Sequence, residues 1–206
     1  MSALIIGLTG GIASGKSAAT AAFESRGIVV ADADLAARDA VAPGSAGLDE
    51  VVARFGRGAL AADGSLDRAA MRRRIFDDPD ARLLLEAIIH PRVRESLHTA
   101  CEAAASPYAV AAIPLLAEGG RAHYPWVHRV LVIDVPGDLQ LARLLARDGI
   151  DPALATRMIA AQASLETRLA IADDVIVNDA SLEVLEARVD ALDARYRVLS
   201  ASMPPG

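Results

Sequence analysis

Short runs of consecutive apolar residues alternate along the chain with longer segments in which apolar residues recur at helical spacing. The apolar runs predict buried strands over residues 3–8, 28–31, 108–113, 129–133 and 174–177. The helical spacing predicts helices over residues 17–26, 35–41, 139–147 and 181–199, with two short helices between 151 and 171. This alternation is typical of an α/β fold, here three layers with a five-stranded parallel sheet in the middle.

The middle of the chain has a different pattern, because residues 48–104 show helical spacing throughout and no strand signal. A turn is predicted at Ala62-Asp63-Gly64-Ser65, and Pro79 and His90-Pro91 are expected to interrupt the helices. We therefore expect a core of about residues 1–45, 106–138 and 172–200, a helical substrate-binding insertion over about 46–105 and a helical lid over about 139–171.

The first predicted strand leads directly into the spacing Gly10-x-x-x-x-Gly15-Lys16-Ser17, which matches a phosphate-binding P-loop. Glycines let the backbone turn tightly, so that successive N–H groups point at one phosphate, and the following helix adds its positive N-terminal end. Lys16 would reach the β- and γ-phosphates, and the Ser17 hydroxyl would bind Mg²⁺. The sequence therefore predicts a nucleotide-phosphate site at residues 10–17.

The choice of basic residues supports this interpretation. Lys16 is the only lysine of the chain, and the other 20 basic residues are all arginine. A compact, flexible ammonium group suits a phosphate, whereas arginine serves at every other basic position. This pattern favours a P-loop over a glycine-rich turn that merely starts a helix.

Composition narrows the class of protein. The 206 residues are 53% hydrophobic but only 3% aromatic, which predicts a sizeable core of mainly aliphatic side chains. A net charge of −6 argues against non-specific nucleic-acid binding, and the single cysteine, Cys101, excludes a disulfide framework within the chain. The apolar start is too short for a signal peptide, and no run approaches about 18 apolar residues, so we expect a cytoplasmic protein without a membrane segment.

Two sets of carboxylates follow predicted strands and therefore fall, with the P-loop, at the sheet edge where such folds bind ligands. Asp134 ends the apolar run 130–133, which resembles a Walker B strand. Asp32 and Asp34 follow the second strand, and strand alternation would point their side chains the same way. Paired carboxylates suit one metal ligand and one general base, so we favour Asp32 and Asp34, with a helix N-cap as the alternative role for Asp34.

Arginines supply the remaining candidate chemistry. Arg143 and Arg147 lie one turn apart on a helix that ends at Asp148-Gly149, a pattern typical of a mobile lid. Lid arginines would neutralise charge on a transferred phosphoryl group, although solvated helix charges have the same spacing. The helical insertion carries a basic cluster that fits either an anionic acceptor or a solvated face: Arg68, Arg72, Arg73 and Arg74.

Taken in order, these motifs resemble those of the bacterial dephospho-coenzyme A kinase family over nearly the whole chain. The matching stretches include GLTGGIASGKS at 7–17, DADLAAR at 32–38, IPLLAE at 113–118, QLARLLARDG at 140–149, QAS-x-E-x-R at 162–168 and ADDVIVND at 172–179. The P-loop alone indicates only a nucleotide-binding protein, whereas the combination is far more specific. The resemblance implies transfer of the γ-phosphoryl group of ATP, with Mg²⁺, to the ribose 3′-hydroxyl of dephospho-CoA, the last step of CoA synthesis.

The resemblance also implies roles for individual residues. The ATP phosphates would be held by Gly11, Ile12, Ala13, Ser14, Gly15, Lys16 and Ser17. Asp34 would be the base for the 3′-hydroxyl, Asp32 or Ser17 would lie near Mg²⁺, and Asn178 would lie near the adenine. Arg143 and Arg147 would act from the lid together with Lys16. The acceptor would contact Thr9, Asp34, Arg68, His90, Leu115 and Glu118, and we expect the chain to act as a monomer.

Four positions depart from the usual family pattern: Ala13, Ala18, Ala117 and Val177. Ala13 stands where glycine is usual, so that position must tolerate a Cβ atom. Ala18 replaces a common threonine, while Ala117 and Val177 affect the expected packing of the acceptor and the adenine.

Other functions compatible with a P-loop differ in what they require elsewhere. A nucleoside-monophosphate or shikimate kinase would share the ATP site and differ in the acceptor region. A GTPase switch would need a second lysine in its base-specifying motif, which this sequence lacks. A catalytically inactive ATP-binding protein stays open at this point.

Overall fold

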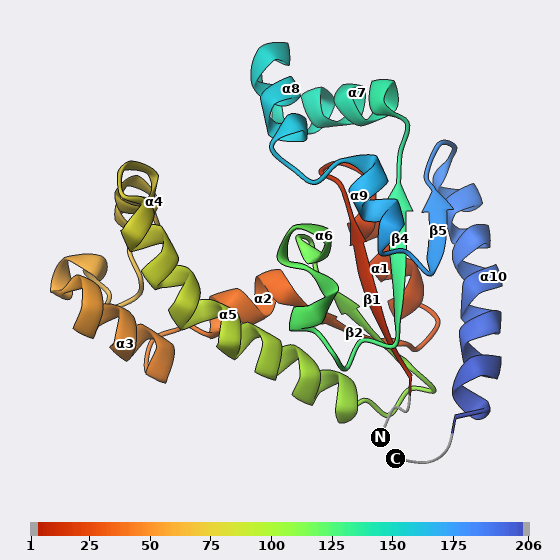
Figure 1. Cartoon of the computed structure of the whole chain (residues 1–206), viewed down its shortest axis with the longest axis horizontal. Helices are drawn as coiled ribbons and strands as arrows, with labels where there is room; N and C mark the ends of the chain where they lie inside the picture. Colours follow the sequence, from red (N-terminus) through yellow and green to blue (C-terminus); the bar gives the residue numbers. More distant parts are fainter. Residues whose placement is uncertain (1–3, 204–206) are drawn as a thin grey trace. The chain divides into compact units, whose positions relative to one another are not determined.

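The computed structural model describes residues 4–203 and contains a parallel five-stranded sheet in the order β2-β3-β1-β4-β5 (Figure 1). The strands are β1 (Ile5–Gly10), β2 (Val29–Asp32), β3 (Ala109–Ala112), β4 (Arg129–Asp134) and β5 (Asp174–Val177). β1 pairs in parallel with β3 and β4, and β4 pairs in parallel with β5. The predicted α/β fold with five parallel strands is confirmed; residue 3 of the first predicted strand lies outside the described residues.

The helices divide between two compact units, which we call the P-loop unit (residues 1–31 and 100–206) and the helical unit (residues 32–99). Helices that begin in the helical unit are α2 (Ala33–Asp39), α3 (Ala46–Phe55), η1 (Arg57–Ala59), α4 (Arg68–Asp77) and α5 (Pro79–Glu102). The P-loop unit holds α1 (Lys16–Glu24), α6 (Leu116–Gly119), η2 (Arg121–His123), α7 (Gly137–Asp148), α8 (Pro152–Ala160), α9 (Leu165–Ala170) and α10 (Leu182–Ala201). Among the described residues, none of these helices has the length and apolar character needed to cross a membrane.

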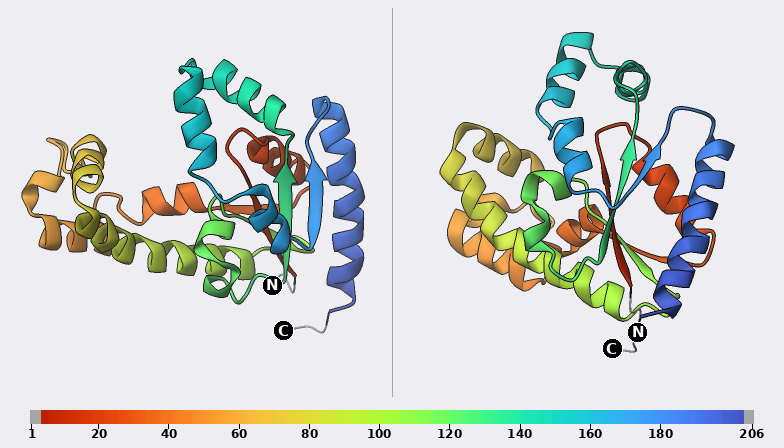
Figure 2. Two further views of the ribbon diagram at one scale, coloured as in Figure 1. Left: turned by 45° about the horizontal axis from the view of Figure 1, so that its top comes forward. Right: turned by 45° about the vertical axis from the view of Figure 1, so that its right-hand side comes forward.

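Helices lie on both faces of the sheet (Figure 2). On one face, Ile6 and Leu8 of β1 join Leu131 and Ile133 of β4 in a buried cluster with α1 and α10. On the other face, α6 contacts β1 and α9 contacts β4. β1, β3 and β4 are buried on both faces, which explains why they appear in the sequence as uninterrupted apolar runs. The edge strands β2 and β5 are apolar in sequence but expose part of their side chains, among them Val29, Val175 and Val177.

The core is mainly aliphatic, as expected, but the buried cluster of the P-loop unit contains three aromatic side chains. Phe23, Tyr108 and Tyr196 are fully buried, and their rings meet edge to face with centroid distances of 6.3 and 5.4 Å. The Tyr108 hydroxyl donates to Asp193, and that of Tyr196 donates to Asp174. Burial raises the pKa of both hydroxyls, so they act as neutral donors.

The structure corrects two predicted element boundaries. β1 continues through Thr9 to Gly10, because Gly10 still pairs in register with Ile133 of β4. The expected interruption at Pro91 is also wrong, since α5 runs through it. Proline removes one helical hydrogen bond, but Ile88 and Val93 are buried on either side of it, and tertiary packing outweighs this local cost.

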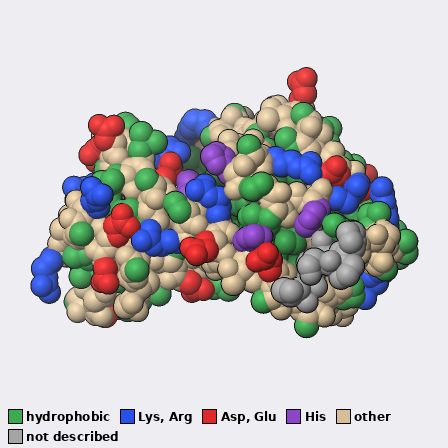
Figure 3. Space-filling model, turned by 60° about the horizontal axis from the view of Figure 1, so that its bottom comes forward, with side chains coloured by type: hydrophobic (Ala, Val, Ile, Leu, Met, Phe, Trp, Pro, Cys, Tyr) green, Lys and Arg blue, Asp and Glu red, His purple; other side chains and the backbone are tan. Residues whose placement is uncertain are grey.

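Charged side chains of both signs are interspersed on the molecular face shown in Figure 3.

In the helical unit, one arginine of the predicted basic cluster makes internal contacts. The guanidinium of Arg74 lies 4.9 Å from the centroid of the Phe55 ring and donates to the Phe55 carbonyl at 3.0 Å. Arg74 is therefore a structural member of this cluster.

Candidate nucleotide-binding site

The P-loop joins the end of β1 to the first turn of α1. Residues 11–15 form the loop, and Gly15 directly precedes α1 with φ of 97°. Ala13 is also left-handed, at φ of 56°, and is the only non-glycine residue with positive φ among those described. The Cβ expected at this position is thus accommodated, at a local cost of about 1–2 kcal/mol. Left-handed residues in a loop direct successive backbone N–H groups towards one point, as an anion-binding site requires.

Asn178, which follows β5, forms a hydrogen bond with the P-loop. Its side-chain Nδ2 donates to the Ser14 carbonyl at 2.8 Å, and its backbone N–H donates to the Asp134 carbonyl at 2.7 Å. Arg143 of α7 donates to the Asn178 carbonyl at 2.9 Å. Asn178 is only 6% exposed, so its side chain holds the P-loop, and its contact with the adenine stays a prediction.

Gly15 cannot carry a side chain without moving this asparagine. A Cβ added at Gly15 would lie 2.1 Å from Asn178 Nδ2, in addition to the strain of the left-handed backbone. We expect Gly15→Ala to weaken ADP binding by about tenfold or more, because strain and a displaced hydrogen bond each cost about 1 kcal/mol. Isothermal titration calorimetry measures this effect.

The matched control is Gly27→Ala. Gly27 has a similar φ of 75°, but a Cβ there would meet no heavy atom within 4 Å. This variant should lower the stability by about 1 kcal/mol and leave ADP binding unchanged. Equal ADP affinities in both variants would contradict the role given to the Gly15–Asn178 contact.

The lysine of the P-loop lies across the loop itself. Lys16 Nζ donates to the carbonyls of Gly10 and Gly11 at 2.7 and 2.9 Å. Ser17 lies in the first turn of α1 and is exposed. The ammonium group and the hydroxyl thus stand at the positive end of the helix, where a phosphate would bind.

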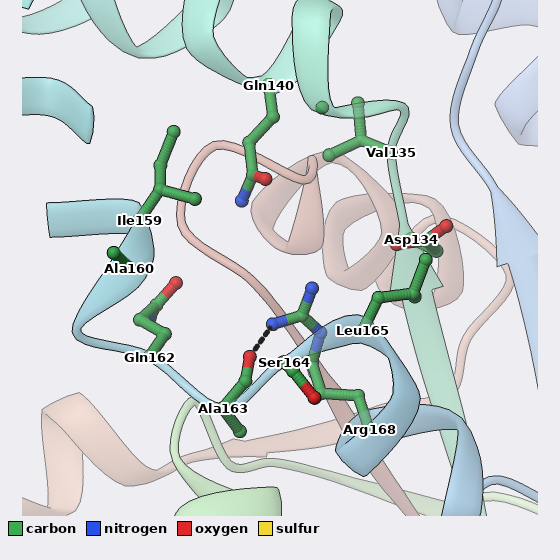
Figure 4. A pocket seen from close by; sticks show the side chains of 11 residues that line it. Asp134, Val135, Gln140, Ile159, Ala160, Gln162, Ala163, Ser164, Leu165 and Arg168 are labelled. Carbon is green, nitrogen blue, oxygen red and sulfur yellow. Dashed lines mark hydrogen bonds between the residues drawn. The ribbon is translucent and has the colours of Figure 1, made fainter. Parts of the chain in front are cut away.

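Two glutamines that the sequence analysis missed hold the predicted lid segment on the P-loop (Figure 4). Gln140 of α7 donates from Nε2 to the Ile12 carbonyl at 2.8 Å, and Gln162 accepts the Ile12 N–H at 2.6 Å. Gln140 is 5% exposed. Gly11 permits this approach, because a Cβ there would lie 2.7 Å from Gln140 Nε2.

The two predicted lid arginines differ in their contacts. Arg143 reaches the end of β5, as described above, whereas Arg147 forms a two-pronged pair with its neighbour Asp148 at 2.7 and 3.0 Å. This pairing raises the pKa of Arg147 and lowers that of Asp148. In this structure Arg147 is therefore engaged by Asp148.

A third arginine, Arg168 of α9, lies next to the loop instead. Its guanidinium donates to the Ala163 carbonyl and lies beside a cavity of about 320 Å³, whose lining also includes Gln140, Gln162 and Asp134 (Figure 4). The sequence contained this residue only as the last position of QAS-x-E-x-R, without a role.

Residues expected to contact the acceptor also occur in the P-loop unit. Thr9 is buried and its hydroxyl donates to the Pro114 carbonyl at 3.2 Å, which joins the end of β1 to the loop after β3. Leu115 is 56% exposed, and Glu118 accepts the Ala163 N–H at 2.9 Å. Glu118 thus joins α6 to the segment that carries the lid glutamine.

The helical unit contains the remaining candidates, and it corrects the interpretation of the two aspartates. Asp32 ends β2 and caps α2, with its Oδ1 accepting the N–H groups of Asp34 and Leu35 at 2.7 and 3.1 Å. The N-cap is therefore Asp32 and not Asp34. Asp34 lies in the first helical turn, so the argument from strand alternation is wrong. Asp34 is exposed, as are Arg68, the first residue of α4, and His90 of α5.

The described residues do not gather three or more His, Cys, Asp or Glu side chains into a metal-binding group. A nucleotide-bound Mg²⁺ does not need such a group, because it takes phosphate oxygens, waters and one or two protein oxygens. The Ser17 hydroxyl and an aspartate fit that donor set.

Comparison with known proteins decides the family. The sequence model of a protein family described as dephospho-CoA kinase matches residues 4–183. The chain belongs to the dephospho-CoA kinase family. A relative of that name from Xanthomonas euvesicatoria is 56% identical over 98% of this chain and 99% of its own length. Another from Thiobacillus denitrificans is 50% identical over 97% and 98%.

Solved structures agree with this family in fold. The protein TT1252 from Thermus thermophilus is similar with a TM-score of 0.79 at 33% identity, covering 95% of this chain and 98% of that one. A dephospho-CoA kinase from Campylobacter jejuni has a TM-score of 0.71 at 24% identity, covering 93% and 96%. At that identity the second comparison bears on the fold alone.

Proposed function

We propose that this kinase transfers the γ-phosphoryl group of ATP to the ribose 3′-hydroxyl of dephospho-CoA, giving ADP and CoA in the final step of CoA synthesis. The observation that carries the proposal is the family match over residues 4–183, which includes both the P-loop and the acceptor region. The match disfavours the alternatives of a nucleoside-monophosphate or shikimate kinase, because the P-loop ATP site is the only predicted feature that these enzymes share with this chain.

In the proposed reaction a bond forms between the 3′-oxygen and the γ-phosphorus, and the bond from the γ-phosphorus to the bridging oxygen of ADP breaks. The amides of residues 11–17 would hold the phosphates, and Lys16 would stabilise the charge on the β- and γ-phosphates. Asp34 would accept the proton of the 3′-hydroxyl. Mg²⁺ bound by ATP neutralises phosphate charge, and Ser17 with Asp32 would supply protein oxygens to it.

The other predicted roles support binding. Asn178 would lie near the adenine, and Thr9, Leu115, Glu118, Arg68 and His90 would contact the acceptor. We propose that residues 46–105 bind dephospho-CoA and that residues 139–171, with Arg143 and Arg147, close as a lid that excludes water from the γ-phosphate. The enzyme would act as a cytoplasmic monomer.

The test of the function is ADP release from Mg-ATP with separate acceptors: dephospho-CoA, AMP, CMP, shikimate and none. We expect turnover with dephospho-CoA alone and a product heavier by one phosphate, measured by mass spectrometry. Turnover with another acceptor would retain a P-loop kinase and overturn the substrate. ATP binding without turnover on any acceptor would indicate a nucleotide-binding protein without this activity.

A further inference from the structure

The guanidinium of Arg168 is buried against the P-loop with unused hydrogen-bonding capacity. Arg168 is 9% exposed, and a Cβ placed on Gly11 would lie 3.5 Å from both its Cζ and its Nη1. Nη1 donates to the Ala163 carbonyl, whereas the buried Nε has no partner. Within the described part of the chain no carboxylate forms an ion pair with it. A buried, unneutralised cation is costly unless an anion binds beside it.

The position of Arg168 on the loop indicates which part of a nucleotide it would meet. The lysine of a P-loop serves the β- and γ-phosphates. Lys16 Nζ lies 2.9 Å from the carbonyl oxygen of Gly11, the same residue against which Arg168 packs. The two cations therefore approach one glycine, at the end of the loop nearest the γ-phosphate.

Neighbouring contacts hold this guanidinium in place. Glu118 accepts the N–H of Ala163, and the carbonyl of Ala163 accepts from Arg168. Gln140 donates to the Ile12 carbonyl and Gln162 accepts the Ile12 N–H, and these two hydrogen bonds fix the adjacent lid segments on the loop. A charge held in this way needs little reorganisation when the phosphoryl group develops negative charge.

We propose that Arg168 contacts the γ-phosphoryl group of bound ATP and stabilises it during transfer. The role in transfer rests on the proposed function, but the contact itself requires only ATP. As the bond from the γ-phosphorus to the bridging oxygen breaks, charge spreads over the γ-oxygens, and the planar guanidinium fork can donate to two of them. Arg168 is thus the γ-phosphate arginine, a role for which Arg147 is less suited because Asp148 engages it.

The experiment compares ADP with a non-hydrolysable ATP analogue by calorimetry in the presence of Mg²⁺ and without acceptor. For Arg168→Gln we expect ADP affinity within about twofold of the parent and analogue affinity lower by about tenfold or more, the usual effect of losing a hydrogen bond to a charged group. Arg168→Lys keeps the charge but loses the planar fork, so its affinity for the ATP analogue should lie between those of the parent and of Arg168→Gln. With dephospho-CoA, kcat of Arg168→Gln should fall on the order of 10²-fold.

The matched control is Arg195→Gln, which removes the same charge from an exposed arginine of α10, outside the proposed lid and binding sites. Its partner Asp174 keeps its contacts with Arg129 and Tyr196. This control variant should leave both affinities and kcat unchanged. Equal loss of ADP and analogue binding in the Arg168 variants, with a lowered melting temperature, would overturn the proposal in favour of structural support. Unchanged analogue binding would overturn it as well. Because no acceptor is needed, a failure of dephospho-CoA to react would contradict the proposed function and leave this comparison valid.

Discussion

Replacement of Asp34 by asparagine is expected to lower kcat with dephospho-CoA by about 10²- to 10⁴-fold, the usual contribution of a general base. Asparagine has nearly the same size and keeps a hydrogen-bonding oxygen, but it cannot accept the proton of the 3′-hydroxyl. The variant should fold, because Asp34 is exposed in the first turn of α2 and loses only about 0.3–1 kcal/mol of favourable interaction with the helix dipole. Steady-state ADP release and calorimetric ATP binding together measure the effect.

Asp39→Asn is the control, because Asp39 is an exposed aspartate in the last turn of the same helix. It should keep full activity. Reduced ATP affinity in Asp34→Asn would indicate a role in binding the nucleotide. Full activity in Asp34→Asn, with loss of activity in Asp134→Asn, would move the base to the end of β4.

The parts of the fold that the sequence predicted well depend on local signals. The apolar runs predicted all five strands, because β1, β3 and β4 are buried on both faces and the edge strands β2 and β5 are still rich in valine. The last strand was predicted at its observed bounds, Asp174–Val177. The glycine spacing identified the P-loop because the left-handed backbone at Gly15 is a requirement of the loop itself.

Predictions failed where distant contacts outweigh a local preference. Pro91 normally favours a break, but buried residues on both sides keep α5 continuous. The capping residue and the common orientation of the two aspartates were predicted wrongly, since β2 ends at Asp32 and the helix begins one residue later, which makes Asp32 the cap. A boundary one residue away thus removed the strand alternation on which the pairing relied.

The contacts between the predicted lid and the P-loop could not be predicted from sequence spacing. Gln162 lies 150 positions from Ile12, and Gln140 lies 128 positions from it, so no local periodicity connects them. Arg147 was favoured on helical spacing, on the glycine turn that follows it and on the family resemblance, and its adjacent residue, Asp148, binds it in the folded chain. Arg168 had the necessary burial and position, and only the folded chain brings it to Gly11.

Replacement of Lys16 by methionine is expected to reduce kcat/KM for ATP by about 10³-fold, because it removes the charge that, in the proposed reaction, stabilises the β- and γ-phosphates in the transition state. Lys16→Arg should recover less than about tenfold of this loss. Its rigid fork cannot repeat the two hydrogen bonds of Nζ to Gly10 and Gly11 in the same small space. Initial rates of ADP release with dephospho-CoA measure both variants.

The composition of the chain provides an independent check on the same residue. Lys16 is the only lysine, so a lysine-directed acylating reagent followed by peptide mass spectrometry reports on this side chain alone among the 21 basic residues. Mg-ATP should protect Lys16 from the reagent, and the acylated protein should lose activity in proportion to labelling. Activity that survives complete labelling, or full activity in Lys16→Arg, would show that the ammonium group is not needed at the phosphates. The chain's exclusive use of arginine elsewhere would then have no functional meaning at residue 16.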